Sequence, residues 1–373
     1  MKSNNSALLV TIFKVPNYGS MLQAYATQVI LEEAGCKCTV LNYDHINCEW
    51  SEKHGVKKQG FINKIGRLLG LKPHHRKSNK LSAFAKRHLH LTKPYKSFHE
   101  IAKREGGKYD YYIVGSDQVW NSRFTNCDPV FLLDFVNDSN KFAISSSFAS
   151  NVIDSQYTSI YNNALKKFKC ISVRDQNGID ILNSMGISNA ELTLDPTLLL
   201  PASSWRKLID NKKISQEKYI LLYMWCYAFE PRPLIFDVLK HFQKKMGCNI
   251  IALEGYRECA ECSDLNIKDA TDSSVSDFLN LFANASLVVT SSFHGTAFAL
   301  NFGRPLVSIT PDGDDDRQGC LLKQLNLKQC ELKISCNTIS ENLNPFYDVS
   351  AEQKALASLR NHSIKIINQM VKS

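Results

Sequence analysis

The chain has 373 residues, of which 44% are hydrophobic and 22% are charged. At roughly 150 residues per domain, this length predicts about two domains, and the composition excludes wholesale disorder and fibrous structure. The formal net charge is +9, but residues 51–104 alone hold 15 Lys or Arg against two acids. The rest of the chain is therefore slightly acidic, which excludes a uniformly basic protein that coats nucleic acid.

The N-terminal sequence and the cysteines point to a cytoplasmic protein. The apolar run at residues 7–13 is short and is followed by Lys14 and Pro16, so it predicts a buried strand rather than a signal peptide. No window approaches 18 uninterrupted apolar residues, so no transmembrane helix is expected. Twelve cysteines in such a chain predict reduced thiols. The only close pairs are Cys36/Cys38 and Cys259/Cys262, and no second well-spaced pair completes a four-ligand zinc site, so no metal is expected.

Hydrophobic periodicity predicts strands and helices that alternate along the chain. Residues 7–13, 21–34 and 38–43 predict strand, helix and strand, and this βαβ unit favours a parallel sheet with helices on both faces. Further strands are predicted at residues 109–114, 141–147, 170–173, 192–194, 219–225, 249–253, 287–290 and 305–309. Further helices are predicted at residues 157–167, 178–185, 235–245, 275–285, 296–301 and 351–371.

This alternation predicts an α/β fold made of two Rossmann-like lobes that face a central cleft. We expect the first lobe to span residues 1–202, with a basic helical insert at about 51–104. The second lobe is expected at 203–345, and the terminal helix at 346–373 is expected to pack back on the first lobe. Ligands of such sheets bind beyond the carboxyl ends of the strands, so we expect functional residues at the strand-to-loop junctions.

The basic insert predicts short amphipathic helices. Apolar residues recur at helical spacing while Lys64 and Arg67 lie off that stripe; the apolar residues are Phe61, Ile62, Ile65, Leu68 and Leu69. Residues 81–89 continue the pattern. Two interpretations stay open for the insert: a helical pair packed on its domain with solvated lysines, or a surface that contacts an anionic membrane or glycan-lipid.

Two strand exits in the first half carry candidate binding residues. The turn that contains Asn17, Gly19 and Ser20 leads into a helix, and its free N–H groups together with the helix dipole predict an anion site. The second exit sets polar groups beside an aromatic platform, which suits a sugar ring or an enol acid, although its Asp also fits a simple turn cap. Its residues are Gly115, Ser116, Asp117, Gln118, Trp120 and Asn121.

Two later strand exits add a guanidinium and an imidazole. Arg174 follows an apolar strand, where it suits capture of phosphate or carboxylate, or a local ion pair with Asp175. The other exit reads Ser291, Ser292, Phe293, His294, Gly295 and Thr296. A helix N-terminus lowers the pKa of an imidazole and attracts anions, so His294 is expected to donate a proton to an anionic substrate. The acidic loop at 312–316 lacks the closing Glu of an EF-hand and predicts a solvated loop.

Five motifs together resemble the polysaccharide pyruvyl transferase family. They are Asn17-Tyr-Gly-Ser, Val114-Gly-Ser-Asp-Gln-Val-Trp-Asn, Val173-Arg-Asp, Leu194-Asp-Pro-Thr and Ser291-Ser-Phe-His-Gly-Thr-Ala-Phe, in this order. The resemblance runs from about residue 7 to about residue 330. It implies a fold similar to type B glycosyltransferases. It also implies the family's reaction, in which phosphoenolpyruvate forms a pyruvate ketal on a sugar of a bacterial surface polysaccharide, as in a capsule or exopolysaccharide.

The resemblance also implies roles for individual residues. His294 would be the general acid, Arg174 would neutralise the phosphate or carboxylate, and Asp117 would orient or deprotonate the acceptor hydroxyl. The turn at Asn17–Ser20 and the helix start at Gly295–Thr296 would supply backbone donors. Well-known branches of the family carry Arg where this chain has Ser292. Arg317 and Arg304 are the candidates to supply that cation.

The resemblance implies no cofactor beyond the donor phosphoenolpyruvate, and no nucleic acid. The acceptor would be a saccharide, and a polyprenyl-diphosphate-linked acceptor would bring the basic insert to the inner membrane face as a peripheral contact. Two alternatives stay open: a nucleotide-sugar-dependent glycosyltransferase of type B fold, and a non-catalytic scaffold in polysaccharide assembly.

Overall fold

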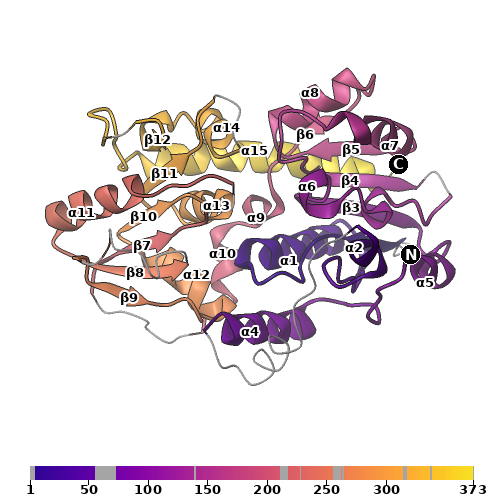
Figure 1. The fold of residues 1–373 in the computed structure, drawn as a ribbon, viewed down its shortest axis with the longest axis horizontal. Coiled ribbons are helices and arrows are strands. Elements are labelled where there is room, and N and C mark those ends of the chain that lie inside the picture. The colour runs from indigo at the N-terminus through magenta and orange to yellow at the C-terminus, as the bar shows by residue number, and fades with distance from the viewer. Residues whose placement is uncertain are drawn as a thin grey trace. The chain divides into compact units, whose positions relative to one another are not determined.

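The computed structural model describes residues 5–54, 73–137, 140–210, 217–226, 228–254, 262, 264–313, 317–336 and 338–372. The chain divides into two compact units (Figure 1). Unit 1 comprises Met1–Leu69, Leu81–Leu199 and Leu359–Ser373, and unit 2 comprises Gly70–Lys80 and Leu200–Ser358. Part of the basic insert thus belongs to unit 2, while the amphipathic helix expected at 61–69 lies outside the described residues.

Unit 1 contains a parallel six-stranded sheet in the order β2-β1-β3-β4-β5-β6. Its strands are β1 (Asn5–Val10), β2 (Cys36–Val40), β3 (Tyr111–Asp117), β4 (Lys141–Ser146), β5 (Cys170–Val173) and β6 (Glu191–Leu192). Its helices are α1 (Tyr18–Glu33), α2 (Glu49–Lys53), the part of α4 (Pro73–His88) from Leu81 on, α5 (Phe98–Glu105), α6 (Ser122–Thr125), α7 (Ser155–Leu165), α8 (Gln176–Ser184) and α9 (Pro196–Leu199). Strands β3 and β4 are buried almost throughout, as expected for a parallel sheet covered on both faces.

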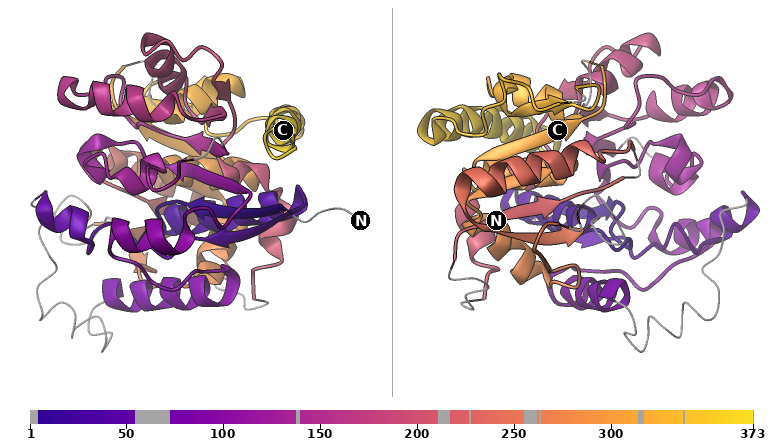
Figure 2. Two further views of the ribbon diagram at one scale, coloured as in Figure 1. Left: turned by 90° about the vertical axis from the view of Figure 1, so that its right-hand side faces the viewer. Right: turned by 60° about the vertical axis from the view of Figure 1, so that its left-hand side comes forward.

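Unit 2 contains a second parallel six-stranded sheet in the order β12-β11-β10-β7-β8-β9. Its strands are β7 (Tyr219–Tyr223), β8 (Asn249–Glu254), β9 (Ile267–Asp269), β10 (Leu287–Thr290), β11 (Leu306–Thr310) and β12 (Glu331–Lys333). Its helices are α10 (Ala202–Arg206), α11 (Leu234–Met246), α12 (Val275–Asn284), α13 (Phe293–Asn301), α14 (Arg317–Gln324) and the first part of α15 (Val349–Met370), which belongs to unit 1 from Leu359 on. In both views of Figure 2 the strands of each sheet lie side by side.

The two parallel sheets with their helices confirm the predicted α/β fold of two lobes. The sequence does not predict β9 and β12, because strands of three residues are too short to show an alternating pattern. It also misplaces the start of α13, which begins at Phe293 rather than Thr296. The hydroxyl of Ser292 caps this helix by accepting the N–H of Gly295 at 3.5 Å, so the first turn already contains His294.

Each sheet has one point at which the strand order reverses. In unit 1 the chain runs from β1 outward to β2 and then returns to the opposite side of β1 as β3. In unit 2 it runs from β7 outward through β8 and β9 and returns to the opposite side of β7 as β10. Loops diverge at the carboxyl ends of such strand pairs and leave a crevice, which is where ligands of this class of fold bind. The two switch points, β1/β3 and β7/β10, are therefore the places to look for function.

Among the described residues, no helix combines the length and apolar character that crossing a membrane requires.

Candidate functional site

The switch point of unit 1 is bridged by a hydrogen bond between Ser20 and Asp117. Ser20 lies in the first turn of α1, after β1, and its hydroxyl donates to Oδ2 of Asp117 at 2.6 Å. Asp117 ends β3 with a φ of 64°, in the left-handed region that costs a non-glycine residue free energy. The side chain of Asn17 caps α1 by accepting the N–H of Ser20 at 3.2 Å. The turn predicted as an anion site is thus fixed by its own side chains.

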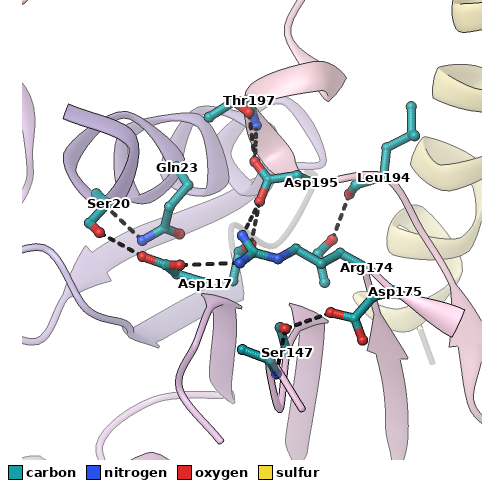
Figure 3. A network of polar contacts seen from close by, with 12 residues as sticks. Ser20, Gln23, Asp117, Ser147, Arg174, Asp175, Leu194, Asp195 and Thr197 are labelled. Carbon is teal, nitrogen blue, oxygen red and sulfur yellow. Dashed lines mark hydrogen bonds and ion pairs between the residues drawn. The ribbon is translucent and has the colours of Figure 1, made fainter. Parts of the chain in front are cut away.

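Arg174 connects two carboxylates in the interior of unit 1 (Figure 3). Its Nη1 donates to Oδ2 of Asp195 at 2.6 Å, and its Nη2 donates to Oδ1 of Asp117 at 3.2 Å. Burial alone would lower the pKa of this guanidinium, but the charges of Asp195 and Asp117 raise the pKa above its usual value. The side chain is fully buried, so it holds two carboxylates together and does not present a guanidinium to a ligand.

Asp195 is the member of this network that sequence reasoning did not name as a site residue. It accepts the hydroxyl of Ser116 at 3.1 Å, and it accepts both the N–H and the hydroxyl of Thr197, at 2.9 and 2.6 Å. An Asp-Pro-Thr sequence after a strand is typical of a capped turn, and Asp195 both caps that turn and pairs with Arg174. The feature of the sequence that could have identified Asp195 is its place in the Leu194-Asp-Pro-Thr motif.

The other residues of the strand exit at 115–121 have structural contacts. A Cβ on Gly115 would lie 2.5 Å from the carbonyl oxygen of Ile144, so only glycine allows β3 to approach β4 there. Asn121 donates to the side chain of Gln118 at 2.8 Å and caps α6. The indole of Trp120 is buried and donates to the carbonyl of Phe131 at 3.2 Å. Trp120 is therefore part of the core, and the prediction of an aromatic platform at this residue is wrong.

Asp175 serves as a helix cap rather than as an ion-pair partner of its neighbour. Its Oδ1 accepts the N–H of Gly178 at 3.0 Å, which caps α8, and its Oδ2 accepts the hydroxyl of Ser147 at 2.5 Å. Figure 3 shows Asp175 and Ser147 beside the Arg174 network. The predicted segments of unit 1 are residues 17–20, 115–121, 174–175 and 194–197. They meet at one edge of the sheet, where their polar side chains are mostly buried and bond to one another or to neighbouring residues.

The switch point of unit 2 contains His294 in the first turn of α13. His294 is 6% exposed. Gly295 is required beside it, because a Cβ there would lie 2.2 Å from the hydroxyl oxygen of Thr290. The hydroxyl of Thr296 shares a 2.8 Å hydrogen bond with that of Ser308, which ties the helix to β11. The imidazole therefore sits at a helix N-terminus that is locked against two strands.

Of the two cations suggested for this site, Arg317 lies close to it and Arg304 does not. The guanidinium of Arg317 lies over the ring of Phe293, with Cζ 5.8 Å from the ring centroid. Arg304 precedes β11, and β11 is parallel to β10. Arg304 therefore lies at the amino end of the sheet, while His294 follows its carboxyl end. The suggestion of Arg304 is wrong for this reason.

Ser291 links the two strands of this switch point. Its hydroxyl accepts the N–H of Trp225 at 2.9 Å and donates to the carbonyl of Trp225 at 2.8 Å. Trp225 lies two residues after the end of β7, and sequence reasoning did not single it out. The feature of the sequence that could have identified Trp225 is its position at the end of a predicted strand.

The described residues contain no group of three or more His, Cys, Asp or Glu side chains that could hold a metal ion. Cys259 and residues 314–316 of the acidic loop lie outside the described residues. In the described part of that loop, Asp312 accepts the N–H of Ser335 at 3.0 Å.

Comparison with known proteins identifies the family. A sequence model of polysaccharide pyruvyl transferases matches residues 17–313. The chain belongs to this family. Membership implies a transferase with a saccharide acceptor. No curated protein matched the chain.

Solved structures that resemble this family member share little sequence with it. The UDP-GlcNAc 2-epimerase from Methanocaldococcus jannaschii is 12% identical, with 95% of this chain and 92% of that chain covered and a TM-score of 0.48. The glycotransferase of kitacinnamycin is 13% identical, with 99% of both chains covered and a TM-score of 0.47. The E. coli ADP-heptose LPS heptosyltransferase II is 11% identical, with 96% and 99% covered and a TM-score of 0.44. The fold assignment rests on the two sheets themselves.

Proposed function

We propose that the protein transfers the enolpyruvyl group of phosphoenolpyruvate to a sugar of a bacterial surface polysaccharide or its lipid-linked precursor, and forms a pyruvate ketal with release of phosphate. Family membership supports this class of reaction. The observation that carries the proposal is the position of His294, in the first turn of α13 at the switch point of unit 2, with Arg317 beside the adjacent Phe293.

The chemistry of the donor matches these groups. Phosphoenolpyruvate carries a carboxylate and a phosphate, which favour the N-terminus of α13 and the guanidinium of Arg317. An acid must protonate the methylene carbon, and the resulting positive charge develops on the carbon that bears the phosphate. An imidazolium at His294 would give that proton, and a positioned acid of this kind contributes about 10² to 10⁴ in rate.

The remaining steps need two sugar hydroxyls and no cofactor. The first hydroxyl oxygen attacks the cationic carbon and loses its proton. The carbon–oxygen bond to phosphate then breaks, and phosphate leaves. The second hydroxyl attacks the new cation and closes the ketal, with loss of its proton. The donor supplies the whole transferred group.

For unit 1 we propose a positioning role instead of direct catalysis. Both oxygens of Asp117 accept hydrogen bonds, from Ser20 and Arg174. Both oxygens of this carboxylate are thus committed to buried contacts within the network. Asp117 and Arg174 would therefore fix the turn at the start of α1 and the exit of β3.

Peripheral contact with the cytoplasmic membrane face belongs to the same proposal. Lys86 and Arg87 are exposed in the last turn of α4, and Lys93, Lys103 and Arg104 are exposed further along the insert. Such a basic surface would hold the enzyme near an anionic membrane that contains a polyprenyl-diphosphate-linked acceptor.

A phosphate-release assay tests the proposed function. The enzyme is incubated with phosphoenolpyruvate and a panel of lipid-linked and aryl glycosides. We expect acceptor-dependent release of phosphate and a rise in melting temperature with phosphoenolpyruvate alone. Stabilisation by a nucleotide sugar but not by phosphoenolpyruvate would contradict the proposal and indicate a glycosyltransferase.

A further inference from the structure

An indole and a carboxylate lie together at the switch point of unit 2. Trp225 follows β7, and its backbone is held to Ser291, which follows β10. Glu254 ends β8, the neighbour of β7 on its other side. The N–H of Met224 donates to the carbonyl of Glu254 at 3.4 Å, which keeps the two strand ends adjacent. Three neighbouring parallel strands thus place Trp225, Glu254 and the loop to His294 at one edge.

Lys77 holds this indole and carboxylate in place. Its Nζ forms an ion pair with Oε2 of Glu254 and lies 5.5 Å from the centroid of the Trp225 ring. The Lys77 side chain has no exposed surface. A buried ammonium needs a carboxylate partner, and an aromatic face adds a favourable cation–π contact. Lys77 is therefore a positioning residue that orients both groups.

Helix α4 contacts unit 2 through residues on both sides of Lys77. Arg76 forms an ion pair with Asp272 at 2.7 Å, and Nζ of Lys80 donates to the carbonyl of Asp272 at 2.6 Å. These contacts join the part of α4 that ends at Lys80 to unit 2, whereas α4 from Leu81 on belongs to unit 1. This part of the basic insert has specific partners and is not a generic solvated face.

Trp225 and Glu254 remain partly accessible. The side chain of Glu254 is 17% exposed, and Trp225 is half-buried. The tryptophans Trp120 and Trp205 are fully buried in the cores and offer no surface to a ligand. The edge of unit 2 therefore has a partly exposed indole next to a partly exposed carboxylate that an ion pair holds in place.

We propose that Trp225 and Glu254 form the subsite for the acceptor saccharide. The C–H face of a pyranose would stack on the indole, and a ring hydroxyl would donate to the Glu254 carboxylate. The Glu254–Lys77 ion pair has no net charge, so this position suits a neutral sugar, whereas the donor anions suit Arg317 and the N-terminus of α13. The subsite lies beside the strand pair β7/β10, and β10 leads to His294. The assignment of this sugar as the acceptor rests on the proposed function, in which His294 is the acid.

Ligand-observed NMR with simple sugars tests the subsite. The probes are the methyl glycosides of glucose, galactose and mannose, titrated into the full-length protein. We expect at least one to bind saturably. Trp225→Ala should raise the Kd of that glycoside by about tenfold, because stacking on an aromatic ring contributes roughly that factor. Trp225→Phe should raise the Kd by less, because it keeps an aromatic ring. Trp50→Phe is the matched control, since Trp50 is a half-buried tryptophan of unit 1, and it should bind like the wild type.

A double variant tests the carboxylate without leaving a buried charge. Lys77→Met with Glu254→Gln removes both members of the ion pair, and it should weaken sugar binding severalfold with the fold retained. Unchanged sugar affinity in Trp225→Ala overturns the subsite, and so does the failure of all three glycosides to bind the wild type.

The effect of phosphoenolpyruvate on the melting temperature separates the subsite from the proposed function. If phosphoenolpyruvate stabilises the protein but sugar affinity is independent of Trp225, the subsite fails and the proposed function survives. If sugars bind through Trp225 but phosphoenolpyruvate neither stabilises the protein nor releases phosphate, the pyruvyl transfer fails and a saccharide subsite survives.

Discussion

The two switch points of this protein have the same topology but opposite character. In unit 1, the crevice between β1 and β3 is filled by Ser20, Asp117 and Arg174, which bond to one another and leave the guanidinium fully buried. In unit 2, the edge between β7 and β10 retains a half-buried indole in Trp225, beside a partly exposed carboxylate in Glu254. Equivalent positions in a fold can thus serve either rigidity or ligand binding.

The difference follows from what surrounds each cation. Arg174 donates hydrogen bonds to Asp195 and Asp117. These aspartates also accept hydrogen bonds from the hydroxyls of Thr197 and Ser20. Lys77 pairs with one carboxylate and an aromatic ring. A network in which most members are satisfied internally rigidifies its surroundings. A pair at an accessible edge keeps part of its surface for a ligand.

The largest expected effect is on the stability of unit 1. Arg174→Met would leave Asp117 and Asp195 close together and buried without their cation. Breaking a buried ion pair by removing one partner costs about 3 to 5 kcal/mol, so the urea midpoint should fall sharply. The control is Arg123→Met, because Arg123 is exposed and should change the free energy of unfolding by less than about 0.5 kcal/mol. Equal midpoints for the two variants would contradict the structural role of Arg174.

A smaller effect concerns the pH dependence of unit 1. Burial lowers the pKa of His45 to about 4, with only partial compensation by Asp44 and Asp117. The unfolded chain therefore binds this proton first as pH falls, and stability is lost between about pH 6.5 and pH 4. At pH 5 this one group should cost about 2 kcal/mol relative to pH 7.

Unfolding of His45→Gln at both pH values measures this cost. The variant should lose less stability on acidification than the wild type, by that amount. His99→Gln is the control for replacement of a histidine, because His99 is exposed. The same acid loss in wild type and His45→Gln would show that His45 does not titrate in this way.

A third effect concerns membrane binding by the basic insert and not the stability of a unit. Replacing Lys57, Lys58, Lys64 and Arg67 by Gln should weaken sedimentation with anionic liposomes, since each basic residue near such a surface contributes about 1 kcal/mol. Higher salt should weaken binding of the wild type in the same direction. Turnover of a soluble acceptor should not change. Equal liposome binding by both proteins would contradict membrane contact through these residues.

The sequence predicts the strand exits well because backbone patterns there are local. The strands β5 and β10 begin and end where periodicity places them, and the segments around Asp117, Arg174 and His294 do lie at carboxyl edges. Local patterns do not determine which side chains are covered. Trp120 looks like a platform in its motif, but its burial depends on packing in the core of unit 1.

Long-range partners are the part that could not be predicted. Asp195 bonds to a guanidinium 21 positions earlier, and Glu254 pairs with a lysine 177 positions away, in a segment that the charge count groups with the insert. No local spacing links such residues. Their pairing depends on strand order, which the sequence of elements alone leaves open.

The contrast between the two switch points is tested most directly by the rate of phosphate release from phosphoenolpyruvate in the presence of an acceptor. The variants are His294→Gln in unit 2 and Ser20→Ala in unit 1, assayed at a temperature where both are folded. We expect kcat to fall by about a hundredfold or more in His294→Gln, as for loss of a general acid, and by only a few-fold in Ser20→Ala. A wild-type rate in His294→Gln would contradict the assignment of the chemistry to unit 2.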